Sequence, residues 1–85
     1  MVSEKVIINS INGIHLRPAG VIAEVAMKYS SSIYLVNGDK KVNGKSLLSI
    51  LSLGIRGGAE IEIVCDGKDE RLALERLVGI LQEGK

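Results

Sequence analysis

The stretch Glu60-Ile61-Glu62-Ile63-Val64-Cys65 decides the fold class, because polar and apolar side chains alternate along most of it with a period of two. This pattern predicts a half-buried strand whose core face holds Ile61, Ile63 and Cys65. Asp66 and Gly67 follow as a turn, and Asp69 is expected to cap a final helix. The apolar side chains that would share one face of this helix are Leu74, Leu77, Val78 and Leu81.

Three further strands are predicted upstream, where Asn and Gly separate short apolar runs. Residues 6–8 predict the first of them. Residues 33–36 and 40–43 predict a hairpin, because Asn37-Gly38-Asp39 between them readily takes the positive φ that a tight turn requires.

Two further helices complete the pattern. A helix over residues 16–29 is indicated by apolar side chains at three- and four-residue steps, namely Pro18, Val21, Ile22, Val25, Ala26 and Tyr29. A short second helix is expected to begin after the cap Ser46 and to stop at Gly54. The order βαββαβα predicts an α+β fold, a four-stranded antiparallel sheet covered on one face by three helices and solvated on the other, an open-faced β-sandwich.

Composition limits the class of protein. The 85 residues suffice for a single domain spanning 1–85, and without Phe or Trp its core must be aliphatic. The net charge of +1 and the scarcity of aromatics argue against nucleic-acid binding. The lone Cys65 predicts a buried, reduced thiol in a cytoplasmic protein. No signal peptide, lipidation motif or membrane-spanning stretch is expected.

The only histidine, His15, stands at the predicted start of the first helix, within Asn12-Gly13-Ile14-His15-Leu16-Arg17-Pro18-Ala19. A helix N-terminus exposes unpaired N–H groups and a partial positive charge, so it binds anions readily. We expect His15 to hold a phosphoryl group whose oxygens contact the amides of Leu16 and Arg17 and the Arg17 guanidinium. The same positive environment is expected to lower the pKa of the His15 imidazole, which makes it a neutral nucleophile.

The residues alone leave other interpretations of His15 open. A histidine beside an arginine also fits a surface residue that caps the helix. A metal site is less well supported, because His15 and Cys65 lack the compact spacing of zinc ligands, and we expect neither a metal nor a cofactor. Hydrolytic catalysis is disfavoured, since no second histidine and no Gly-x-Ser-x-Gly motif is present.

Two motifs resemble the HPr phosphocarrier family of the bacterial sugar phosphotransferase system. Gly13-Ile14-His15-Leu16-Arg17-Pro18-Ala19 is similar to the active-site signature of that family. Lys45-Ser46-Leu47-Leu48, leading to Ser52-Leu53-Gly54, is similar to its second signature. The resemblance extends over essentially the whole chain, including its length, the order of its elements and the positions of both motifs.

This resemblance implies a phosphoryl-transfer intermediate rather than a free-standing enzyme. Enzyme I, phosphorylated by phosphoenolpyruvate, would pass the group to Nδ1 of His15, which would pass it to the IIA domains of sugar permeases. The resemblance also implies a second phosphorylation, on Ser46, by an ATP-dependent HPr kinase/phosphorylase. That modification would regulate sugar uptake and catabolite control, with a catabolite-control transcription factor as a further partner. A cytoplasmic monomer is expected.

Three positions depart from the common pattern of the family. Asn12 stands where Ser or Thr is frequent, and Leu16 and Gly20 replace the more usual small or hydroxyl residues. We expect Asn12 to contribute to the phosphate pocket and Gly20 to the docking surface. The choice of partners is therefore left open.

The short second helix is rich in leucine. Ile50 and Leu53 can face the sheet, so Leu47, Leu48 and Leu51 are expected to form an exposed patch for partner docking. The alternative is a helix buried on all sides. A phosphate on Ser46 would suit the helix dipole while placing about two negative charges at the rim of the patch, which would alter docking.

Other functions remain as alternatives. The nearest is a paralogous carrier in a nitrogen-related phosphotransferase chain, which would use the same histidine with different partners. A second is a regulatory module that docks on a transcription factor or an enzyme. A small metabolic enzyme is the least supported, because the sequence shows no constellation of a deep catalytic pocket.

Overall fold

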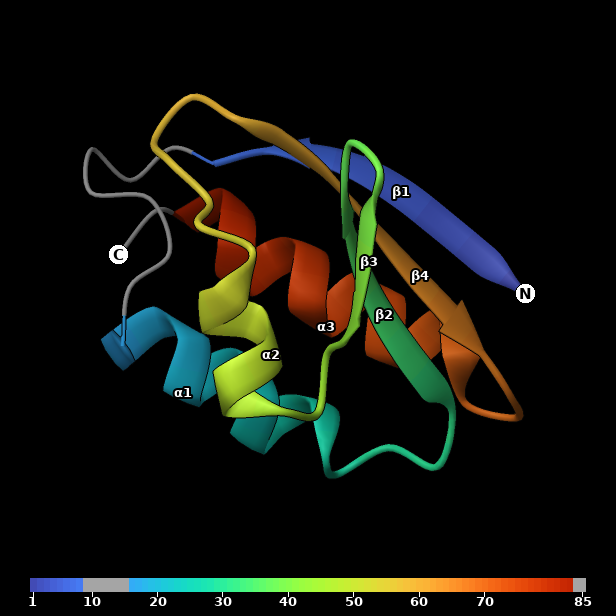
Figure 1. The fold of residues 1–85 in the computed structure, drawn as a ribbon. Coiled ribbons are helices and arrows are strands. Elements are labelled where there is room, and N and C mark those ends of the chain that lie inside the picture. Colours follow the sequence, from blue (N-terminus) through green and yellow to red (C-terminus); the bar gives the residue numbers. More distant parts are fainter. Residues whose placement is uncertain (9–15, 84–85) are drawn as a thin grey trace.

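The computed structural model describes residues 1–8 and 16–83, with the side chains of Leu16, Arg17 and Glu83 outside the described part. The elements run β1 (Val2–Ile7), α1 (Leu16–Ala26), β2 (Ser32–Asn37), β3 (Lys40–Asn43), α2 (Leu47–Ser52), β4 (Glu60–Asp66) and α3 (Glu70–Glu83), as Figure 1 shows. The described strands form one sheet in the order β1-β4-β2-β3, with antiparallel neighbours throughout. The predicted α+β class and element order are confirmed.

Strand β4 is an inner strand of the sheet and pairs with both β1 and β2. Its predicted core residues Ile61, Ile63 and Cys65 are at most 1% exposed. The register sets Ile61 opposite Val6 on one side, and on the other side it sets Ile63 opposite Leu35. The period-two pattern therefore gave the correct buried face.

The three helices lie on one face of this sheet (Figure 1). α1 packs against both α2 and α3, while α3 also covers β1 and β4. The aliphatic side chains that α1 and α3 bury are Ala19, Ile22, Ala23, Val25, Ala26, Ala73, Leu77, Val78 and Leu81. Helix α1 consequently lies between the other two helices. The helix that begins after His15 is therefore in contact with α2.

The first helix differs from its prediction in two ways. It ends at Ala26 rather than at residue 29, because Lys28 and Tyr29 donate to carbonyls three residues back, which tightens the last turn. Val21, predicted on the apolar face, is 45% exposed. At 3.6 residues per turn Val21 lies about 200° round the helix from the buried Ala19.

The first strand is longer than residues 6–8. Its backbone pairs with β4 from Val2 opposite Cys65 to Ile7 opposite Glu60. Backbone pairing needs no apolar side chain, so the exposed Ser3, Glu4 and Lys5 belong to the strand. Ile8 follows the strand and is buried, with its backbone bonded to Gly58 and Ala59.

The open face of the sheet is more apolar than the sequence pattern predicted. Val64 is only 9% exposed, because Ser3 and Tyr34 flank it on the neighbouring strands. The Lys41 ammonium lies 4.4 Å from the centre of the Tyr34 ring, where a cation interacts favourably with the aromatic face. This face is therefore a mixed surface rather than a polar one.

Asp69 joins two turns that are distant in sequence. Its carboxylate accepts hydrogen bonds from the Ser31 hydroxyl and from the backbone amides of Ser30 and Ser31, at 2.9 and 3.0 Å for the amides. Gly67 packs so closely that a Cβ there would lie 2.7 Å from the Cα of Ser31. As predicted, Asp69 stands directly before α3, and its carbonyl accepts from the amide of Ala73 at 3.0 Å, but its carboxylate bonds to donors of another turn. The Glu70 carboxylate accepts from the amide of Gly67.

We predict that Asp69 makes folding stability depend on acid pH. The hydrogen bond from Ser31, followed by that from Ser30, lowers the pKa of Asp69 to about 2, against about 3.9 in an unfolded chain. The stabilisation is complete above the unfolded value and is lost as the pH falls towards the folded one. Asp69→Asn should lower stability at neutral pH and flatten its dependence between about pH 4 and 2, measured by urea unfolding. The matched Asp39→Asn protein should behave as the parent, and equal stability of Asp69→Asn and parent at neutral pH would contradict the assignment.

Candidate functional site

The predicted phosphate site lies at the N-terminal end of α1. The helix begins at Leu16, the residue that follows His15, and its first turn contains no acidic residue. Nothing in that turn therefore opposes the positive end of the helix dipole. Asn12 and His15 lie outside the described residues, as do the side chains of Leu16 and Arg17.

The second predicted site, Ser46, is the N-cap of α2. Its backbone is extended, with φ −110° and ψ 113°, and its Oγ accepts a hydrogen bond of 3.3 Å from the amide of Ser49. Two hydrogen bonds position the backbone just before this cap. The Asn43 side chain accepts from the amide of Lys45 at 2.9 Å, and the Lys45 ammonium donates to the Tyr29 carbonyl at 2.8 Å. The predicted cap and the stop at Gly54, whose φ is +60°, are both confirmed.

The leucine patch on α2 is smaller than predicted. Ile50 and Leu53 are buried, as expected from the pattern. Leu48 is 78% exposed, whereas Leu47 and Leu51 are half-buried against the core. The alternative of a helix buried on all sides is therefore wrong. Of the expected patch, Leu48 is exposed, whereas Leu47 and Leu51 are only partly exposed because they also pack against the core.

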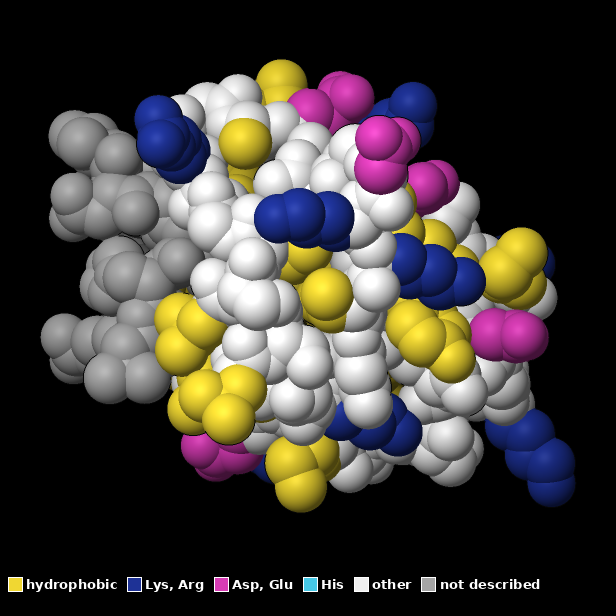
Figure 2. Space-filling model, in the orientation of Figure 1, with side chains coloured by type: hydrophobic (Ala, Val, Ile, Leu, Met, Phe, Trp, Pro, Cys, Tyr) yellow, Lys and Arg dark blue, Asp and Glu magenta, His cyan; other side chains and the backbone are white. Residues whose placement is uncertain are grey.

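The surface next to Leu48 includes part of α1. Figure 2 shows hydrophobic side chains at the surface over α1 and α2. Gly20 lies inside α1, and a Cβ there would meet no heavy atom within 4 Å. The exposure of Val21 adds an apolar side chain on α1 that the sequence pattern had assigned to the core. Exposed apolar side chains are thus found on both helices.

The described part of the chain gives little support to metal binding or to catalysis by the cysteine. No group of three or more His, Cys, Asp and Glu side chains capable of holding a metal is found there. Burial raises the pKa of the Cys65 thiol to about 11, which makes it a poor nucleophile. Across the described residues, no helix has the length and apolarity that crossing a bilayer demands. A groove along α3, which the sequence did not indicate, is described below.

Comparison with known proteins gives consistent matches. Residues 2–83 match the family model described as PTS HPr component phosphorylation site. The HPr-like protein Crh of Bacillus subtilis is 36% identical over 83 residues, 98% of each chain. The phosphocarrier protein HPr of Borreliella burgdorferi is 35% identical over 85 residues, 100% of this chain and 99% of its own.

Solved structures show the same fold. HPr-C-His from Thermoanaerobacter tengcongensis superposes with a TM-score of 0.94 at 34% identity, covering 99% of this chain and 94% of its own. Crh of Bacillus subtilis, solved as a swapped, intertwined dimer, superposes with a TM-score of 0.80 at 36% identity, covering 99% and 97%. The similarity therefore extends over nearly the whole chain.

We predict that removing the Ser46 hydroxyl destabilises the fold. Ser46→Ala leaves the amide of Ser49 without its acceptor and should lower the free energy of unfolding by about 1 kcal/mol. Ser46→Asp should retain the cap and most of the stability, since Asp is an equally good N-cap. Urea unfolding measures both proteins. A control, Ser3→Ala on the exposed edge strand, should change little, and a Ser46→Ala protein as stable as this control would show that the cap contributes nothing.

Proposed function

Because the chain belongs to the HPr family of phosphotransferase-system phosphocarriers, we propose that it carries its phosphoryl group on the imidazole of His15. One observation supports this assignment above others: α1 begins at the residue after His15, with no acid in its first turn. The free amides and dipole of a helix start favour an anion at that place.

The proposed reaction is a direct displacement. A lone pair on Nδ1 of a neutral His15 attacks phosphorus, and the bond from phosphorus to the donor breaks as the new N–P bond forms. The amides of Leu16 and Arg17, the Arg17 guanidinium and the side chain of Asn12 bind the phosphoryl oxygens. These donors stabilise the spread charge of the transition state, and the acceptor then repeats the displacement in the forward direction.

We propose enzyme I as the donor and IIA domains of sugar permeases as the acceptors, in the cytoplasm. The working form is a monomer and a single domain. A swapped dimer such as that of Bacillus subtilis Crh is the alternative assembly. The distinction matters for docking, because donor and acceptor would use the same surface in turn.

The test of the carrier function is incubation with phosphoenolpyruvate and enzyme I. The parent protein should gain one phosphoryl group by mass, and acid should remove it, since phosphohistidine is acid-labile. His15→Ala should gain none, while Ser46→Ala should be labelled like the parent. The proposal fails if the His15→Ala protein still passes label from donor to acceptor.

We propose that Leu48 is the centre of the docking surface, with Gly20, Leu47 and Leu51 around it. Leu48 is 78% exposed on a helix that packs against α1, which is why a charge there should disturb partners without disturbing the core. Leu48→Glu should slow transfer from enzyme I by about tenfold or more, measured as kcat/KM for the carrier. The matched control is Leu72→Glu, since Leu72 is 65% exposed on α3. Equal rates for the two variants would remove Leu48 from the docking surface.

A second function, regulation through Ser46, is favoured by the position of its hydroxyl. Ser46 caps α2 directly beside Leu47 and Leu48, so a phosphate there would place about two negative charges at the edge of the docking surface. The similarity to Crh of Bacillus subtilis, whose solved structure is described as the catabolite repression HPr, supports a regulatory role. An HPr kinase/phosphorylase would add the phosphate, and a catabolite-control transcription factor would bind the modified form.

A further inference from the structure

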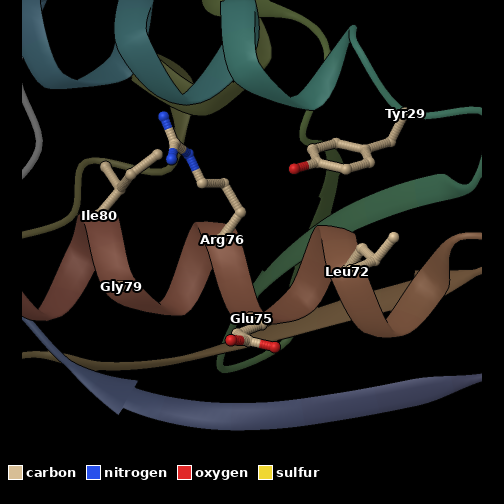
Figure 3. A pocket seen from close by; sticks show the side chains of 6 residues that line it. All are labelled: Tyr29, Leu72, Glu75, Arg76, Gly79 and Ile80. Carbon is tan, nitrogen blue, oxygen red and sulfur yellow. The ribbon is translucent and has the colours of Figure 1, made fainter.

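A groove of about 530 Å³ lies along α3, where Tyr29 from the segment after α1 faces it. Figure 3 shows it from close by. The residues that line it are Tyr29, Leu72, Glu75, Arg76, Gly79 and Ile80. No residue of the proposed phosphoryl site or of the leucine patch on α2 is among them, so the groove is a separate feature of the surface.

Gly79 opens the groove at a cost to the helix. It lies inside α3, where glycine is less favourable than alanine because it leaves more backbone freedom to be lost on folding. A Cβ at this position would meet no heavy atom within 4 Å, so packing within the described chain does not require glycine. Gly20 is in the same situation on the proposed docking surface. Gly79 therefore leaves this part of the groove open to solvent.

The walls of the groove combine apolar and charged side chains. Leu72 is 65% exposed at one end, although leucine on a helix normally turns towards the core. Tyr29 and Ile80 are half-buried and pack against the core from the groove side. The hydrogen bond from Lys45 to the Tyr29 carbonyl fixes the backbone that carries the ring.

The groove also presents an unpaired positive charge. Figure 3 shows the Arg76 side chain reaching from α3 towards α1, on the same side as the Tyr29 hydroxyl, while the Glu75 carboxylate points the other way. Within residues 1–8 and 16–83, neither the Arg76 guanidinium nor the Tyr29 hydroxyl has a hydrogen-bond or ion-pair partner. Two donors beside apolar side chains are complementary to a carboxylate on an apolar surface.

We propose that this groove is a second docking surface, which takes an amphipathic α-helix of a partner protein. The apolar side of that helix would lie against Leu72 and Gly79, and one of its carboxylates would pair with Arg76. The groove is open to solvent, whereas sites for small molecules enclose most of the ligand. A helix in a surface groove is the common mode for such a shape. Because α1 separates the groove from α2, this partner can bind while phosphoryl transfer continues.

The test uses two stapled peptides in titrations of the isotope-labelled full chain by NMR. One peptide is an amphipathic helix with two leucines one turn apart and a glutamate beside them, and the other has lysine in place of the glutamate. The glutamate peptide should bind the parent about tenfold or more tightly than the lysine peptide. The amide shifts should be confined to Tyr29, Leu72, Arg76, Gly79 and Ile80.

Variants make the assignment specific. Arg76→Glu should reverse the preference in favour of the lysine peptide, and Gly79→Leu should abolish binding of both. The control Arg71→Glu, which makes the same charge change on α3 away from this groove, should keep the preference of the parent. Should Gly79→Leu fail to fold, the reversal by Arg76→Glu decides alone.

Four results would overturn the proposal. The first is no binding of either peptide at millimolar concentration, and the second is equal binding of the two. The third is shifts centred on Leu48, which would place the peptide on the other docking surface. The fourth is occupation of the groove by something other than a partner helix. A small ligand would be indicated if 4-phenylbutyrate alone gave the same shifts at the same affinity. A second copy of this chain would be indicated if the shifts depended on protein concentration without peptide.

Discussion

The arrangement of this protein depends on β4 being paired on both sides while one face of the sheet is covered by three short helices. Ile61, Ile63 and Cys65 form the floor of an aliphatic core, and every helix must bury its stripe against them or their neighbours. Without Phe or Trp, each contact contributes little, and close packing must supply the rest. Small side chains on α1, such as Ala19 and Ala23, are buried in this core.

This packing brings together the features on which phosphoryl transfer is proposed to depend. α1 contacts α2, so the start of the helix after His15 and the exposed Leu48 belong to neighbouring elements although about thirty residues separate them in the chain. The Lys45 bond to the Tyr29 carbonyl ties the far end of α1 to the loop before Ser46. The capping serine and the helix that it begins are thus held by α1 as well as by their own hydrogen bonds.

One glycine of this chain is required by the fold, whereas two others lie where contact with other molecules is proposed. Gly67 is required by the fold, because its φ of +157° and the closeness of Ser31 leave no room for a side chain. Gly20 and Gly79 are inside helices with open space at the Cβ position. Both weaken their helices slightly, and both stand where a docking surface is proposed. The cost is small for each, but a domain of this size has little stability to spare.

The sequence alone determined the features that depend on neighbouring residues. Alternation in β4, the Ser46 cap, the Gly54 stop and the Asn37-Gly38 hairpin are all local, and all were predicted correctly. The two HPr motifs likewise identified the family from residues in short stretches. The sequence also gave His15 and Arg17 as candidates, because their chemistry does not depend on distant packing.

The tertiary structure decided what depends on contacts between distant segments. The Asp69 carboxylate bonds to Ser30 and Ser31, donors that arrive from a turn distant in sequence. Val21 faces solvent, Leu47 and Leu51 rest on the core, and Tyr29 and Arg76 line one groove, each because of how whole helices pack on the sheet. Local periodicity defines which residues share a face of a helix, but only packing determines which face is covered and by what.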